Sequence, residues 1–172
     1  MSTRVYGSLA RIADFRNSNF DVQSVPRSEW ATGDYVEGEV VGSITELYHV
    51  EDRSGHMVKV EPGDWVIGAL GERAATLEGV GSWKDIGTDG EMNTLTSAGL
   101  MGSYTSFSVL LAEPLRLKYR GHLCRDNRKV CMSEFAMTAT SHAFNVPTVM
   151  LVGTSMSAGK TTTGRRVCKE LD

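Results

Sequence analysis

The sequence has little cysteine, no long apolar run and no strong excess of either charge. Its longest apolar stretch is of the length of Val149–Val152, far below the ~20 residues of a membrane-spanning helix, so we expect no membrane partner. The first residues lack the apolar stretch of a signal peptide, and three cysteines without such a signal indicate free thiols in a reducing cytoplasm. A formal net charge of −3 favours neither nucleic acid nor an anionic membrane.

What is present is the composition of a folded protein. The hydrophobic fraction of 41% and the charged fraction of 23% are ordinary values, and they permit a buried core. A length of 172 residues suits one domain, or one domain and a piece of another.

Residues 1–140 are predicted to form a mainly β N-terminal domain, either a small barrel or a sandwich, because short strand candidates alternate with glycine-marked turns. Residues 4–14 are a first strand or a loosely packed start, and residues 15–33 are expected to be loop. Residues 81–108 are expected to be a long loop with a short helix near 91–100. The remaining strand candidates are residues 35–41, 45–50, 56–60, 65–70, 75–80, 115–120 and 129–132.

Two of these strands form a predicted hairpin. In Leu115–Arg120, the apolar and basic side chains alternate, which is typical of a strand with one wet face. The turn at Arg125–Arg128 contains Asp126 and Asn127, which tolerate a left-handed backbone. Residues 133–146 then connect to the next region, with a helical turn expected around 133–139.

The last part of the chain is predicted to begin an α/β domain. Residues 141–147 form the connector, and residues 148–172 are the first strand, loop and helix of a truncated domain. Thr148–Val152 is apolar throughout, as in a buried parallel strand. Lys160–Leu171 can be a helix with an apolar face that contains Val167, Cys168 and Leu171.

Between that strand and helix stands Gly153-Thr-Ser-Met-Ser-Ala-Gly-Lys-Thr-Thr162. Phosphate binding needs glycine where backbone amides approach the oxygens, a helix that begins at the loop, and a lysine followed by a hydroxyl. The sequence therefore predicts a nucleotide-phosphate site. Its predicted residues are Gly153, Thr154, Ser155, Ser157, Ala158, Gly159, Lys160, Thr161 and Thr162.

The pattern Gly-Thr, four residues, then Gly-Lys-Thr resembles the loop of the dethiobiotin synthetase and cobyrinic acid amidase group of P-loop proteins, over about residues 148–166. The resemblance implies ATP or GTP and Mg²⁺ as cofactors, with Lys160 at the β- and γ-phosphates and Thr161 helping to hold Mg²⁺. Gly159 and its neighbours would surround the phosphates. Five residues separate Gly153 from Gly159 where the common motif has four, and Ser155 stands where relatives often have Asp.

A working P-loop domain needs further parallel strands and an acidic residue at the end of one of them. Each strand–helix–strand unit takes about 30 residues, whereas twelve residues follow Lys160. We therefore expect these residues to be an N-terminal fragment of a longer protein, which alone binds nucleotide weakly or not at all and is inactive.

For the whole protein, the resemblance implies an ATP-dependent phosphoryl-transfer or ligase-type enzyme. Its β domain would bind a small-molecule substrate or form contacts of a homo-oligomer. The alternative is a non-enzymatic binding or oligomerisation module with a nucleotide switch or a vestigial loop. Loss of turnover in a Lys160→Ala variant of the full-length protein would support the enzyme.

Three further features have competing interpretations. Residues 116–129 hold six basic side chains and one acid, which suits an anionic ligand or, as we prefer, a solvated edge hairpin. The glycine-rich run 94–103 is either a substrate contact or, as we prefer, a plain loop with a short helix. His122, Cys124 and Cys131 could be metal ligands, but close ligand pairs and a fourth ligand are missing, so buried thiols are preferred.

Overall fold

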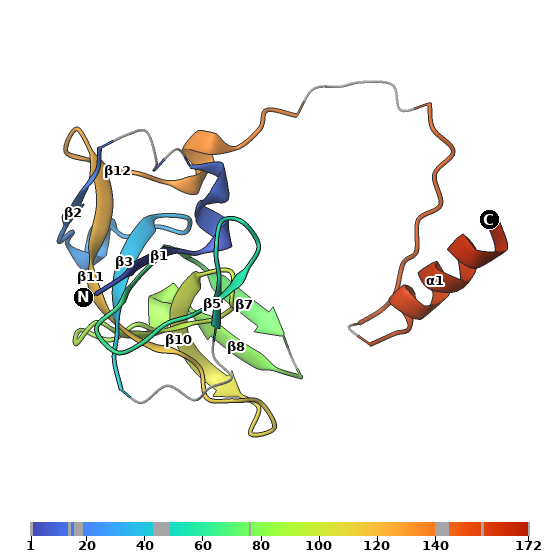
Figure 1. Cartoon of the computed structure of the whole chain (residues 1–172), viewed down its shortest axis with the longest axis horizontal. Helices are drawn as coiled ribbons and strands as arrows, with labels where there is room; N and C mark the ends of the chain where they lie inside the picture. Colours follow the sequence, from blue (N-terminus) through green and yellow to red (C-terminus); the bar gives the residue numbers. More distant parts are fainter. Residues whose placement is uncertain are drawn as a thin grey trace. The chain divides into compact units, whose positions relative to one another are not determined.

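The structure is a computed structural model, shown in Figure 1, that describes residues 2–13, 15, 19–42, 49–75, 77–139, 145–155 and 157–171. The chain divides into two compact units, Met1–Met137 and Thr138–Asp172. The first unit is mainly β, as the pattern of short strand candidates and glycine-marked turns predicts. No helix in the described part of the chain is long and apolar enough to cross a membrane.

The strands of the first unit are short, and four single 3₁₀ turns interrupt them, at Ser8–Ile12, Arg27–Glu29, Trp83–Asp85 and Met132–Phe135. The strands are β1 (Arg4–Tyr6), β2 (Asp21–Gln23), β3 (Tyr35–Val40), β4 (His49–Glu51), β5 (Met57–Lys59), β6 (Trp65–Leu70), β7 (Glu72–Ala75), β8 (Gly79–Ser82), β9 (Glu91–Thr94), β10 (Leu100–Phe107), β11 (Arg116–Arg125) and β12 (Arg128–Lys129).

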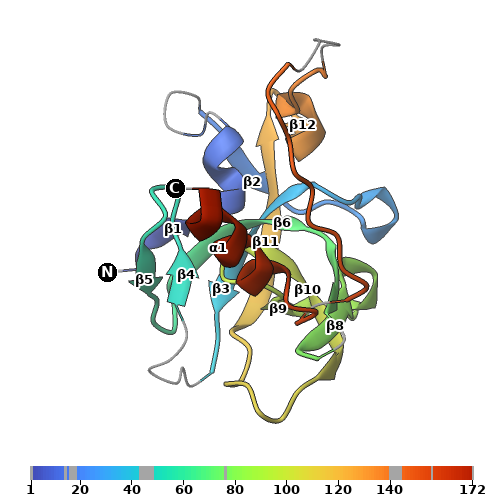
Figure 2. The same cartoon turned by 90° about the vertical axis from the view of Figure 1, so that its right-hand side faces the viewer.

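Five of these strands pair in a closed ring. β3 lies between β6 and β11, β9 lies between β11 and β10, and β10 returns to β6. Only the β10–β6 contact is parallel. Because the pairing closes on itself, the ring is a small barrel rather than two separate packed sheets. β2 and β12 add to the C-terminal half of β11 (Figure 2), and β7 and β8 extend from the far half of β10.

Strand β6 exchanges one neighbour for another at Gly68. Its first half pairs in parallel with β1 and its second half pairs in parallel with β10. A Cβ atom at Gly68 would overlap the carbonyl oxygen of Gly99, and a Cβ at Gly7 would lie 2.6 Å from the carbonyl oxygen of Ala98. Gly99 itself has φ +91°. The three glycines, Gly7, Gly68 and Gly99, therefore form a junction at which three backbones touch.

The central strands are buried on both faces because the barrel has an inside and a covered outside. Val36 and Val40 of β3 belong to one apolar cluster with Val66 and Leu70 of β6. The alternate residues of the same strands belong to a second cluster, which the Ser8–Ile12 turn helps to cover; it contains Tyr35, Ile67 and Ala69 with Ala10, Phe15 and Leu123. This double burial explains why β6 has no charged residue, whereas β3 contains Glu37 and Glu39.

Several sequence predictions for the first unit are confirmed. The strands expected at 35–41, 56–60 and 65–70 appear as β3, β5 and β6. The strand expected at 115–120 is the start of β11, with Leu115 and Leu117 buried and Arg116 and Arg120 exposed. The hairpin turn follows, with φ of 50° at Asp126 and 58° at Asn127.

Other predictions are wrong. Residues 75–80 are not one strand, because β7 ends at Ala75 and β8 begins at Gly79. Residues 81–108 are not a long loop with an α-helix, but contain the end of β8, the 3₁₀ turn Trp83–Asp85, β9 and all of β10. Their glycines serve close packing: a Cβ at Gly81 would lie 2.6 Å from the carbonyl oxygen of Ser103. The loop expected at 15–33 contains β2. The strand expected at 45–50 lies largely outside the described residues, and β4 begins at its end.

The described residues of the second unit include one helix, α1 (Lys160–Leu171), as the sequence predicts. The strand expected at Thr148–Val152 is not found, because no described segment supplies the backbone partners that define a strand. The expected apolar face of the helix is not buried either: Val167 is half-buried, whereas Cys168 and Leu171 are exposed.

The glycine junction predicts a specific sensitivity to one methyl group. Gly68→Ala should lower the free energy of unfolding by about 3 kcal/mol, because the added Cβ meets backbone atoms that cannot move aside. Urea unfolding followed by tryptophan fluorescence measures the change, since all three tryptophans lie in the first unit.

Gly87→Ala is the matched control. There an added Cβ would meet only the side chain of Asp89 at 2.8 Å, so a change below about 0.5 kcal/mol is expected. Equal stabilities of the two variants would contradict a tight crossing at Gly68.

Candidate functional site

The loop at residues 153–162 has an unusual backbone. Ser157 has φ +61° and Gly159 has φ +84°, so the chain turns through two left-handed residues just before α1. A Cβ at Gly159 would meet no atom within 4 Å. Glycine at this position is therefore favoured by the dihedral angle rather than by lack of space.

The side chain of Lys160 lies across the loop rather than away from it. A Cβ at Gly153 would stand 2.9 Å from Cγ and 3.0 Å from Cδ of Lys160, so the lysine stem packs directly on the Gly153 backbone. Its ammonium group donates a hydrogen bond of 2.6 Å to the carbonyl oxygen of Ser155. Gly153 thus makes room for the stem, and the charged end is held inside the loop.

Helix α1 presents a positive end to this loop. The first hydrogen bond at its start joins the amide of Thr163 to the carbonyl oxygen of Gly159 at 2.9 Å, so the amides that precede Thr163 in the first turn have no acceptor within the helix. The first turn contains no acidic residue. The free amides and the helix dipole together favour an anion at this end.

A second residue of the helix, Gly164, also lies close to the preceding segment. A Cβ at Gly164 would meet Cδ1 of Leu151 at 3.2 Å, which explains a glycine inside a helix, where it costs about 1 kcal/mol relative to alanine. The apolar residues around Leu151 are largely exposed: Val149 by 71%, Met150 by 80% and Val152 by 81%. The segment therefore has apolar surface that the described residues leave uncovered.

All nine residues predicted to bind nucleotide lie in this loop and at the start of α1, and all are exposed. Met156, between them, lies outside the described residues. The hydroxyl of Thr161, predicted to help hold Mg²⁺, follows the lysine on the first turn of α1. The one acid among residues 145–155 and 157–171 is Glu170, about 15 Å along the helix, where it pairs with Arg166.

In the first unit, sequence reasoning missed a buried ionisable cluster. Asp34 is 2% exposed, and its Oδ2 lies 2.6 Å from Nζ of Lys129 and 3.3 Å from Nε2 of His122. The amide of Ala31 donates to the same oxygen at 2.8 Å. Burial alone raises the pKa of Asp34, but the hydrogen bonds from His122, Lys129 and Ala31 outweigh it and hold the pKa below its usual value.

The cluster continues to Tyr119. Its hydroxyl lies 2.6 Å from Nδ1 of His122, and its ring centroid lies 4.4 Å from that of Trp30. Burial raises the pKa of Tyr119 to about 12. The cluster is buried at Asp34 and His122, whereas the Lys129 side chain is 26% exposed. The cluster fixes β11 to the start of β3.

The other residues that the sequence singled out are used differently. In the basic segment 116–129, Arg116 lies 3.3 Å from Glu91 and Arg120 lies 3.4 Å from Glu39, so acids from neighbouring strands offset two of its charges. Cys124 and Cys131 are free thiols, and Cys124 pairs in register with Lys129 rather than with Cys131. The described residues contain no group of three or more acidic, histidine or cysteine side chains that could hold a metal ion.

Asp34→Asn should lower the free energy of unfolding by about 2 kcal/mol at pH 7, because it leaves Lys129 and His122 beside a neutral partner. The folded-state pKa of Asp34 is lowered, so its contribution is present above the unfolded value near 4 and is lost as the pH falls through the folded value. The difference between the wild type and the variant should therefore shrink below pH 4. Urea unfolding at several pH values measures it.

Glu39→Gln is the control for this prediction, because it removes an ion pair whose side chains are 51% and 33% exposed. Its expected cost is below about 0.5 kcal/mol. A cost of Asp34→Asn that equals the control, or that does not change with pH, would contradict a stabilising role for the cluster.

Comparison with protein-family models, with curated proteins and with solved structures finds no match for this chain, so the interpretation of the loop depends on its own residues and geometry.

Proposed function

We propose that residues 153–162 bind the β- and γ-phosphates of ATP or GTP, as the phosphate-binding loop of a nucleotide-dependent protein. The observation that carries the proposal is the position of Lys160, whose stem packs on Gly153 and whose ammonium group is held inside the loop by the carbonyl of Ser155. A phosphate would replace that carbonyl as the partner of the ammonium group.

The remaining parts of the loop support the same function. The free amides at the start of α1 and the left-handed backbone at Ser157 and Gly159 give a concave set of donors for phosphate oxygens. Thr161 would help to hold Mg²⁺ through its hydroxyl while the nucleotide supplies further oxygens. Because Glu170 is remote, the described part of the second unit offers this ion no carboxylate.

For the whole protein, the proposal is an ATP-dependent phosphoryl-transfer or ligase-type reaction, in which the β unit binds a small-molecule substrate or forms oligomer contacts. The α/β character of the second unit is part of this proposal, since the described residues include its loop and helix without a paired strand. A cytoplasmic location fits, because that compartment keeps thiols such as Cys168 reduced.

The test is titration of the isotope-labelled chain with MgATP and MgGTP, followed by amide chemical shifts. Binding should move the signals of Gly159, Lys160, Thr161 and Thr162 in a saturable way. Lys160→Ala should weaken binding at least about tenfold, because one charge-assisted hydrogen bond contributes about 1.5–3 kcal/mol.

Lys169→Ala is the matched control: it removes the same charge from the last turn of the same exposed helix. Its binding should equal that of the wild type. The proposal fails if the four amides do not shift at nucleotide concentrations on the order of 10 mM, which corresponds to weaker than millimolar affinity. It also fails if the two lysine variants lose affinity equally.

A further inference from the structure

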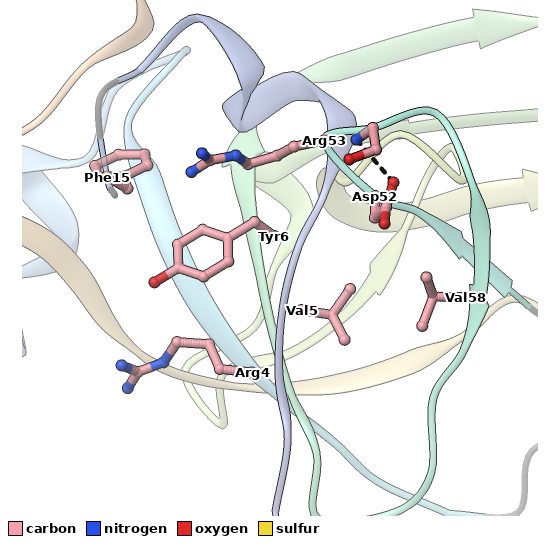
Figure 3. A pocket seen from close by; sticks show the side chains of 8 residues that line it. Arg4, Val5, Tyr6, Phe15, Asp52, Arg53 and Val58 are labelled. Carbon is pink, nitrogen blue, oxygen red and sulfur yellow. Dashed lines mark hydrogen bonds between the residues drawn. The ribbon is translucent and has the colours of Figure 1, made fainter. Parts of the chain in front are cut away.

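The first unit contains a cavity of ≈ 470 Å³ on the side of the barrel where β1 lies (Figure 3). Strand β1 forms one wall, and the turn between β4 and β5 forms another. Its size is within the range of small-molecule sites. The lining residues that matter here are Arg4, Val5, Tyr6, Phe15, Arg53 and Val58.

Arg53 is held at the cavity by a rigid turn. The Oδ1 atom of Asp52 accepts hydrogen bonds from the amides of Ser54 at 2.8 Å and His56 at 3.0 Å, and Arg11 donates to the carbonyl oxygen of Arg53 at 2.7 Å. The amides of His56 and Ser54 also hold the pKa of Asp52 below its usual value. Asp52 is therefore an ionised carboxylate bound to its own turn.

The guanidinium group of Arg53 lies over the ring of Tyr6, with Cζ 5.3 Å from the ring centroid. Within the described ranges, no carboxylate lies within 4.0 Å of it. Its backbone is fixed, its guanidinium group has no ion-pair partner among the described residues, and its side chain lines the cavity.

Arg4 supplies a second guanidinium group on the other side of Tyr6 (Figure 3). Its Nε lies 2.7 Å from Oε2 of Glu37, and its Cζ lies 4.9 Å from the ring centroid of Trp65. A guanidinium has five N–H donors, so the pair with Glu37 leaves its terminal nitrogens available. The hydroxyl of Tyr6 makes no hydrogen bond with any described residue, and Figure 3 shows it pointing to the same side as both guanidinium groups.

We propose that this cavity binds a small monocarboxylate with an aromatic or apolar body. The planar fork of Arg53 matches the two oxygens of a carboxylate, and the Tyr6 hydroxyl, which points to the same side, adds another donor. The apolar body would contact Val5, Val58 and the ring of Phe15, which stacks on Tyr6 at 6.3 Å. Glu37 offsets the charge of Arg4, and the Asp52 carboxylate lies beside Arg53 in the cavity lining, so a single negative charge suits the site better than the two of a phosphate ester.

The experiment uses phenylacetate as the probe, with 2-phenylethanol as its neutral analogue and inorganic phosphate as an anion without a ring. Titration of the full chain at low salt should give saturable shifts of the Tyr6 ring and the Arg53 Nε signal with phenylacetate. The neutral analogue should bind at least about tenfold more weakly, because it lacks the charge-assisted hydrogen bonds.

Arg53→Gln should weaken phenylacetate binding at least about tenfold, whereas Arg128→Gln, at an exposed position of β12, should leave it unchanged. Lys160→Ala should also leave phenylacetate binding unchanged. Failure of this proposal can therefore be distinguished from failure of the proposed nucleotide site. Absence of saturable shifts, equal binding by the Arg53→Gln and Arg128→Gln variants, or stronger binding of inorganic phosphate than of phenylacetate would overturn the proposal.

Discussion

The first unit depends on a backbone crossing that only glycine permits. At the junction of Gly7, Gly68 and Gly99, strand β6 leaves β1 and begins to pair with β10, and the Cα atoms of Gly7 and Gly68 lie within 3.4 Å of the Cβ position of Gly99. With side chains there, β10 could not approach β6, and the ring of five strands would stay open. The same crossing places β1 beside the first half of β6, so that Arg4 and Tyr6 reach the cavity.

A second constraint is electrostatic and lies at the other end of β3. Removing Asp34 from water disfavours its charge, and only the combined donors from Ala31, His122 and Lys129 reverse that penalty. Lys129 is on β12 and His122 is on β11, so one carboxylate connects the hairpin to the start of the barrel. The exposed pairs of Arg116 and Arg120 have the same chemistry but remain hydrated, so they contribute little to stability.

Local patterns in the sequence were sufficient to predict the elements in which buried and exposed residues follow a regular pattern. Strands β3 and β6, the alternating start of β11 and the Asp126–Asn127 turn follow from periodicity and from dihedral preference. The loop predicted for residues 81–108 is wrong because the glycines and serines that suggested it serve close packing between strands. Asp34 and Lys129 are 95 residues apart, and Arg53 meets Tyr6 only after folding, so no local pattern marks either site.

The loop at 153–162 shows how a site can be shaped but not yet organised for tight binding. Its lysine is already folded inward, which lowers the entropy cost of binding, yet it must exchange the Ser155 carbonyl for a phosphate, and that exchange offsets part of the gain. Besides the contacts of Lys160, α1 is supported by a close contact between Gly164 and Leu151, beside exposed apolar side chains. Any surface that covers Val149, Met150 and Val152 would fix the helix start relative to the loop. Nucleotide affinity should therefore rise with the burial of this segment, because the donors would then be held in place before the phosphate arrives.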